Sequence, residues 1–144
     1  MEQIEQDFAV LDEWEDRYKY IIELGRELPE FDEVFRTPAN KVQGCASQVW
    51  LQSFVSDRDR DQPRLRFAAD SDALIVRGLI AIAFALFSGQ TAQNILATDA
   101  SKELERLQLT EHLSPQRSNG FLSLISRIKH DARRALSATA NSEA

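Results

Sequence analysis

Hydrophobic residues recur at helical spacing near both ends of the chain, and this pattern predicts helices there. We expect one short helix over residues 2–12 and a longer one over residues 13–27. Toward the other end, we expect a long helix over residues 119–137, with Ser118 as its N-cap. Residues 138–144 are small and polar, so we expect the tail to be frayed.

The middle of the chain has the alternating pattern that is typical of β-strands. We expect strands over residues 48–55, 64–69 and 73–76, and the short connections between them predict antiparallel pairing. Between the second and third strands, the run Asp70-Ser71-Asp72 has turn chemistry, because short polar side chains bond to their own backbone. Neither face of the first strand is fully polar, so we expect other elements to cover both sides of the sheet.

Residues 79–87 are apolar on every side, which predicts a buried helix at the centre of the core. Two short helices are expected after it, over residues 91–97 and 101–107, with Thr91 and Ser101 as their N-caps. Taken together, the pattern predicts an α+β fold, with a three-stranded antiparallel sheet packed with helices. At 144 residues, the chain has the length of a single domain.

Charge and cysteine content narrow the function classes. The chain has 17 basic and 23 acidic residues and a net charge of −6, which disfavours nonspecific binding to nucleic acid. Acidic residues gather near the start and basic ones in the last expected helix, either as two solvated faces or as a charge-steered docking surface. One cysteine cannot form an internal disulfide, and no signal peptide or membrane-spanning run is visible, so we expect a cytoplasmic protein.

The single cysteine, Cys45, lies between a loop and a strand. Residues 29–41 carry two prolines and no clear period, so they predict a loop with one helical turn at residues 31–35. Gly44 comes directly before Cys45 and permits a turn with positive φ. A cysteine that serves only for packing belongs inside a helix or strand, so we interpret Cys45 as a nucleophile that acts as its thiolate.

Four stretches of the sequence resemble the SufE family. The first is Gly-Cys-Ala-Ser-Gln-Val-Trp at residues 44–50, and the others are residues 18–25, 70–79 and 113–120. They occur in the family's order and span nearly the whole chain. The resemblance implies the SufE/IscU-like fold and the function of a sulfur acceptor in iron–sulfur cluster assembly.

The family's activity implies a partner enzyme. Cys45 would attack the persulfide of a cysteine desulfurase of the SufS or CsdA type, stimulate that enzyme, and pass the sulfur to a downstream cluster-assembly scaffold. We expect no independent turnover, no cofactor, and pyridoxal phosphate only in the desulfurase. One thiolate is too few to hold a metal cluster, so no metal is expected. A monomer or weak homodimer is expected, and the SufE and CsdE branches share the same four stretches.

Four further residues are candidates for the site. Positive charge at the start of a helix opposes the macrodipole, so Arg117 calls for another reason. The resemblance implies that it takes part in engaging the desulfurase, either by stabilising the Cys45 thiolate or by pairing with an acidic group on the partner. Asp72 is explained by turn chemistry alone, although the resemblance implies docking. Gln48 would either donate a hydrogen bond to the sulfur or anchor the loop, and Gly44 would act as a flexible joint. A solvated loop position is the alternative for Arg117.

Other functions remain open on the residues alone. A hydrolytic Cys–His dyad would need His112 or His130 beside Cys45, and only His112 is close in sequence to Arg117. An adaptor that activates a desulfurase by binding alone would not need Cys45 to carry sulfur. A redox sensor is disfavoured because no second cysteine is available to resolve the oxidised thiol.

The surroundings of the cysteine predict protection. Val42, Val49 and Trp50 flank the loop, so we expect Cys45 to be largely buried in the isolated protein, with its side chain against apolar residues. Burial would disfavour the thiolate and slow its reaction with passing thiols.

Overall fold

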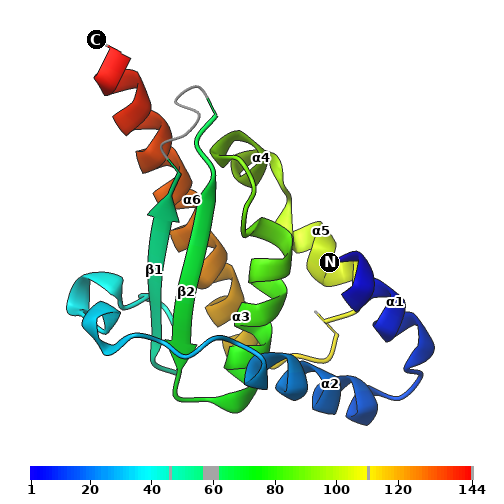
Figure 1. Ribbon diagram of the computed structural model, residues 1–144. Helices are drawn as coiled ribbons and strands as arrows, with labels where there is room; N and C mark the ends of the chain where they lie inside the picture. Colours follow the sequence, from blue (N-terminus) through cyan, green and yellow to red (C-terminus); the bar gives the residue numbers. More distant parts are fainter. Residues whose placement is uncertain (46, 57–61, 110, 144) are drawn as a thin grey trace.

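The structure is a computed structural model that describes residues 1–45, 47–56, 62–109 and 111–143, with side chains described as far as residue 138. Helices surround a short sheet (Figure 1). In chain order the elements are α1 (Glu2–Val10), α2 (Trp14–Arg26), the 3-10 turns η1 (Glu33–Phe35) and η2 (Pro38–Asn40), β1 (Val49–Val55), β2 (Leu65–Ser71), α3 (Leu74–Phe87), α4 (Ala92–Ala97), α5 (Ala100–Arg106) and α6 (Pro115–Glu143). The predicted α+β class is confirmed.

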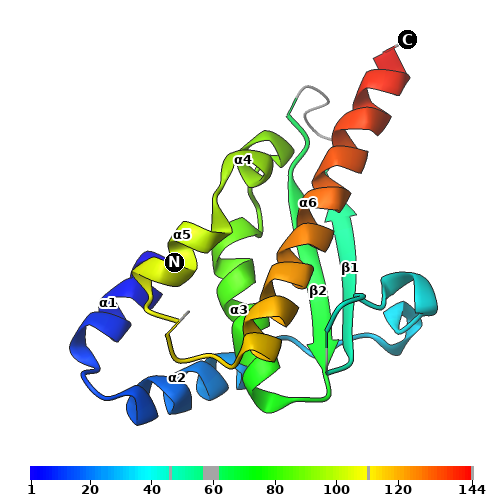
Figure 2. The ribbon, with the colours of Figure 1, turned by 180° about the vertical axis from the view of Figure 1, so that it is seen from behind.

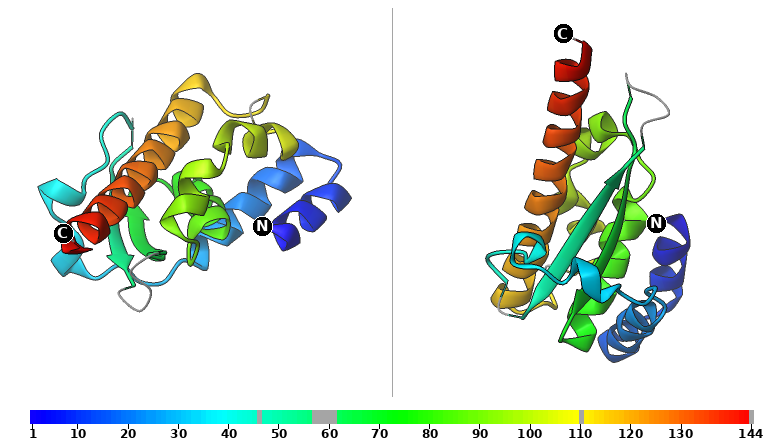
Figure 3. Two further views of the ribbon diagram at one scale, coloured as in Figure 1. Left: turned by 90° about the horizontal axis from the view of Figure 1, so that it is seen from above. Right: turned by 60° about the vertical axis from the view of Figure 1, so that its left-hand side comes forward.

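The sheet has two strands in the described residues, β1 and β2, which pair antiparallel from Val49 opposite Ser71 to Val55 opposite Leu65. Helices α3 and α6 both pack on one face of the sheet, as the view from behind shows (Figure 2). Turns η1 and η2 lie against β1 on the other side (Figure 3). Both faces are therefore covered, as predicted, while most of the expected hairpin connection, residues 57–61, lies outside the described residues.

The predicted third strand is wrong, because residues 74–76 form the first turn of α3. Ile75, Leu79 and Ile82 continue one apolar face at helical spacing, and this longer pattern wins over the short β-like run. Gly78 lies inside α3, which begins five residues before the predicted start at residue 79. A Cβ on Gly78 would lie 2.1 Å from the carbonyl oxygen of Ile21, so the glycine lets α2 and α3 cross closely.

Several helix ends differ from the prediction, most of them by one or two residues. Asp99, rather than Ser101, caps α5, because its carboxylate accepts hydrogen bonds from the backbone N–H groups of Ser101 and Lys102. Helix α6 begins at Pro115, and Ser114 caps it by accepting a hydrogen bond of 3.2 Å from the backbone N–H of Arg117. Ser118 therefore lies inside α6, which continues to Glu143, past its predicted end at residue 137. The predicted cap of α4 by Thr91 is confirmed.

The core lies between the sheet and the helices, with α3 at its centre as predicted. The largest fully buried side chains of β1, β2 and α3 include Leu51, Leu65, Ile80, Ile82 and Phe87. Hydrophobic residues of α6 are buried against them, namely Phe121, Leu124, Ile125, Ile128 and Ala132, but Leu122 is exposed. None of the helices in the described ranges combines the length and the apolar character that crossing a membrane would require.

Candidate functional site

Cys45 lies on a loop between Val42 and Val49, called here the cysteine loop, which is described except for residue 46 and whose two ends are held together. The backbone N–H of Val42 donates a 2.8 Å hydrogen bond to the carbonyl of Val49, and Lys41 forms a bridge with Trp50. Gly44 has a φ of +86°, which glycine adopts without strain. Its carbonyl accepts a hydrogen bond of 3.4 Å from the Ser123 hydroxyl of α6. The predicted tight loop before a strand is confirmed, and the loop contacts α6.

The Cys45 side chain is half-buried and points toward α6. Its Sγ lies 3.5 Å from the carbonyl oxygen of Gly120, to which the thiol donates a hydrogen bond. Burial raises the pKa of the Cys45 thiol. Both features favour the protonated thiol over the thiolate, because a thiolate has no proton to donate to the carbonyl. At rest, Cys45 is therefore a weaker nucleophile than an exposed cysteine.

A cavity of about 360 Å³ opens beside the thiol. Val49 of β1, Leu79 of α3 and Phe121 of α6 contribute apolar surface to it, whereas Ser114 and Arg117 contribute polar groups. The strands and the starts of α3 and α6 come together at this end of the molecule (Figure 1). The cavity has the size of a small-molecule site.

The predicted shielding of Cys45 is met in part. The thiol is half-buried rather than largely buried, and Val49 borders it while Val42 lies in the core. Trp50 does not line the cavity: its ring lies 4.5 Å from the Arg36 guanidinium. Neighbouring residues of a strand point to opposite faces of the sheet, which explains why Val49 lines the cavity and Trp50 does not.

Arg117 lies in the first turn of α6 and lines the same cavity as Cys45. Its side chain is exposed, and its guanidinium carbon lies 5.9 Å from the centre of the Tyr18 ring of α2. Among the described residues it forms no ion pair. Arg117 and Cys45 therefore lie at one cavity, where the guanidinium has donors available to an anionic group.

Asp72 and Gln48 hold each other at the end of the cysteine loop. The Asp72 carboxylate accepts a hydrogen bond of 3.0 Å from the backbone N–H of Gln48, and the backbone N–H of Asp72 donates one of 3.3 Å to the Gln48 carbonyl. Both residues are exposed, and neither lines the cavity. Loop anchoring, one of the two roles left open for Gln48, is the role that its backbone performs here.

The two histidines lie elsewhere. His112 stacks on Trp14 with a ring separation of 4.2 Å, and His130 is exposed on α6. Neither lines the cavity that holds the thiol, so the arrangement of a Cys–His hydrolase does not appear in the described part of the chain. Within the same part, no three His, Cys, Asp or Glu side chains gather closely enough to hold a metal ion.

Sequence reasoning missed Gly120 and Ser123, α6 residues that make hydrogen bonds with the cysteine loop. Gly120 carried a signal, since a glycine inside a helix is unfavourable and calls for a local reason. A Cβ on Gly120 would lie 3.8 Å from Cys45 Sγ, an ordinary van der Waals contact, so the steric space does not by itself require glycine there. Ser123 carried none, because a serine on a helix is ordinary until the fold brings the loop to it.

Comparisons with known proteins agree with the site. The model of the family named SufE, described as an Fe-S metabolism associated domain, matches residues 2–132. A protein of Rhizobium meliloti (strain 1021), named an uncharacterized SufE-like protein, is 56% identical over 132 residues, which are 92% of this chain and 94% of that protein. A protein of the same description from Rhizobium etli is 53% identical over 133 residues, 92% of this chain and 89% of that protein.

The fold also has a solved counterpart. The solution structure of a hypothetical protein from Thermus thermophilus is similar to this structure with a TM-score of 0.66, over 93% of this chain and 96% of that one. The two sequences are 16% identical, so this likeness concerns the fold alone.

Proposed function

This chain belongs to the SufE family, and we propose that its Cys45 takes sulfur from a cysteine desulfurase and passes it on for iron–sulfur cluster assembly. The observation that carries the proposal is the position of the thiol. It lies on a loop, at a cavity, with an arginine that forms no ion pair in the described residues at the same cavity. A loop can present the thiol to a partner, whereas a cysteine within the core could not.

The transfer needs no oxidant or reductant. The Cys45 thiolate attacks the outer sulfur of a persulfide on the desulfurase, the sulfur–sulfur bond of that persulfide breaks, and the desulfurase cysteine leaves as a thiolate. Cys45 then carries the outer sulfur as its own persulfide. In the second step, a nucleophile of the downstream acceptor attacks that sulfur, and Cys45 leaves as a thiolate again.

The resting state described above makes partner binding part of the chemistry. Because burial raises the pKa of the Cys45 thiol, the isolated protein holds mainly the unreactive protonated form. A desulfurase that draws the cysteine loop away from Gly120 removes both the burial and the acceptor carbonyl. Arg117, on the same cavity, then has its guanidinium free to bind an anionic group of the partner.

Intact-mass measurement tests the proposal. The protein is incubated with a desulfurase and cysteine, and its mass is taken before and after treatment with a reductant. We expect a reducible gain of about one sulfur atom, absent in Cys45→Ser, together with loss of desulfurase stimulation in that variant. Full stimulation by Cys45→Ser would instead identify an adaptor that works by binding alone.

A further inference from the structure

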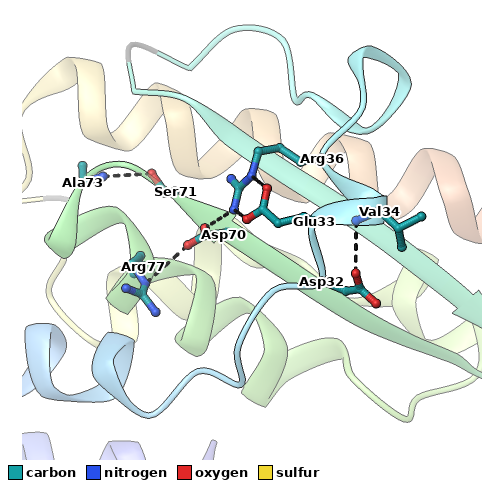
Figure 4. Close-up of polar contacts among 8 residues, drawn as sticks. All are labelled: Asp32, Glu33, Val34, Arg36, Asp70, Ser71, Ala73 and Arg77. Carbon is teal, nitrogen blue, oxygen red and sulfur yellow. Dashed lines mark hydrogen bonds and ion pairs between the residues drawn. The ribbon is translucent and has the colours of Figure 1, made fainter.

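Two arginines converge on one carboxylate next to the cysteine loop. Asp70, near the end of β2, lies 2.9 Å from Nη2 of Arg36 through its Oδ2, and 3.6 Å from Nε of Arg77 through its Oδ1 (Figure 4). Arg36 comes from the segment before the cysteine loop, and Arg77 from the start of α3. The three charged side chains therefore join three separate segments.

Arg36 makes several close contacts in this cluster. Its guanidinium also forms two hydrogen bonds with the Glu33 carboxylate, of 2.8 and 2.9 Å, and lies over the Trp50 ring. Trp50 is the second residue of β1 and stands directly opposite Asp70 in the sheet. Arg36 thus fastens the incoming segment to both strands at the end where the cysteine loop emerges.

Arg77 is less well paired than Arg36 in this cluster. Its Nε is buried, its distance of 3.6 Å from Asp70 exceeds hydrogen-bond reach, and it has no other acceptor in the described residues. A buried donor without an acceptor is destabilising. A shift of the carboxylate toward Arg77 would satisfy that donor, but the same shift would lengthen the contact with Arg36. The two arginines therefore compete for Asp70.

The Asp70 carboxylate is connected to both ends of the cysteine loop. On one side, Arg36 is followed by η2 and then by residues 41 and 42, which pair with the start of β1. On the other side, Asp72 lies two residues after Asp70 and holds the backbone of Gln48. A change in how Asp70 is shared alters the support of both ends at once.

We propose that Asp70 is a positioning residue for sulfur transfer, which sets how readily the cysteine loop leaves its cavity through the competition of Arg36 and Arg77 for its carboxylate. When Arg36 holds the Asp70 carboxylate, the loop stays in its resting position against α6, and when Arg77 holds it, the loop is released more easily. The functional meaning rests on the sulfur transfer proposed above, whereas the effect on the loop does not require it.

Competition predicts changes of opposite sign, and the alkylation rate of Cys45 in the isolated, full-length protein measures them without any desulfurase. Asp70→Asn and Arg36→Gln should speed alkylation, roughly threefold to tenfold for one partly buried ion pair. Arg77→Gln should slow it, because Asp70 then belongs to Arg36 alone. If Arg77→Gln fails to fold, Arg77→Lys keeps the charge while removing Nε. Glu23→Gln is the matched control, since it removes one carboxylate from an exposed pair with Arg26.

A desulfurase assay separates positioning from chemistry. Asp70→Asn should change the concentration of this protein that half-saturates the desulfurase, with little change in the rate at saturation, and Asp70→Glu should restore it in part. An unchanged alkylation rate in Asp70→Asn, or a rate that rises in Arg77→Gln as well, would overturn the inference. Loss of the sulfur-transfer proposal through Cys45→Ser would leave the alkylation result standing, so the two failures are distinguishable.

Discussion

The thiol of Cys45 shares its surroundings with two groups of opposite character. The Gly120 carbonyl accepts the thiol proton, while Arg117 presents a positive charge at the same cavity. The carbonyl favours the thiol and a nearby guanidinium favours an anion, so the outcome depends on where the loop stands. In the resting position burial prevails, because it raises the pKa of the Cys45 thiol.

The pH dependence of alkylation tests this balance. The pKa of Cys45 in the folded protein lies above its unfolded value of about 8.5, so alkylation should rise with a midpoint above that pH. The same protein in denaturant should show the ordinary midpoint. The raised pKa also affects stability, because the folded state binds the thiol proton more tightly than the unfolded state does. The stabilisation of the folded state that results is present below about pH 8.5 and disappears as the pH rises through the folded pKa. A folded midpoint below the denatured one would contradict the resting state described here.

Arg117 should matter for the partner and not for the thiol. We expect Arg117→Ala to weaken desulfurase binding or sulfur transfer while the alkylation rate of Cys45 in the isolated protein stays near wild type. The reason is that the guanidinium is exposed and its one aromatic contact, with Tyr18, is not part of the loop. Arg106→Ala, which removes an exposed arginine on α5, serves as the control. Unchanged binding and transfer would leave Arg117 as a solvated residue in the first turn of α6.

Gly44 combines two constraints that a matched pair of variants can separate. Alanine at Gly44 would adopt a φ of +86° and place its Cβ 2.6 Å from the Ser123 hydroxyl. Gly89 has a φ of +80° with no atom within 4 Å of the same position. Gly89→Ala should therefore lower the free energy of unfolding by about 1–2 kcal/mol, the cost of the backbone alone. Gly44→Ala should lower the free energy of unfolding by more than Gly89→Ala does. Adding Ser123→Ala to Gly44→Ala should remove that additional loss, as urea denaturation would reveal.

At the scale of elements, α3 carries the core. Ile82 is 1% exposed, and we expect Ile82→Ala to lower the free energy of unfolding by about 2–5 kcal/mol, because the cavity left behind cannot fully collapse. Leu74, in the first turn of the same helix, is 54% exposed, so Leu74→Ala should cost far less. Equal melting temperatures for the two variants would show that α3 is not the centre of the core.

The start of α3 also marks the limit of what the sequence predicts. Both strands that form the sheet and most of the helices follow from hydrophobic spacing, and Gly44 with Cys45 indicated the tight loop. Over the few residues 73–76, however, strand and helix patterns are indistinguishable, and only packing on β2 and α2 decides between them. The approach of Gly120 and Ser123 to the loop depends on how α6 crosses the sheet, which no local pattern encodes.

At the scale of the whole molecule, partner binding has to be coupled to loop opening. We expect Cys45 to be alkylated faster in the presence of a desulfurase whose own cysteine has been removed, because docking would draw the thiol out of its half-buried position. A desulfurase of an unrelated family, at the same concentration, is the control. A slower rate in the complex would mean that docking covers the thiol without releasing it.

The register of β1 and β2 also bears on how the protein can be engineered. Val49 and Ser71 pair at the end next to the cysteine loop, and Val55 and Leu65 pair at the opposite end. Seven strand residues separate the two ends by roughly 20 Å, at a rise of about 3.4 Å per residue. A reporter peptide or fluorescent tag inserted into the connection between Val55 and Leu65 would therefore sit remote from Cys45, leaving room for a desulfurase to be tracked as it arrives and departs.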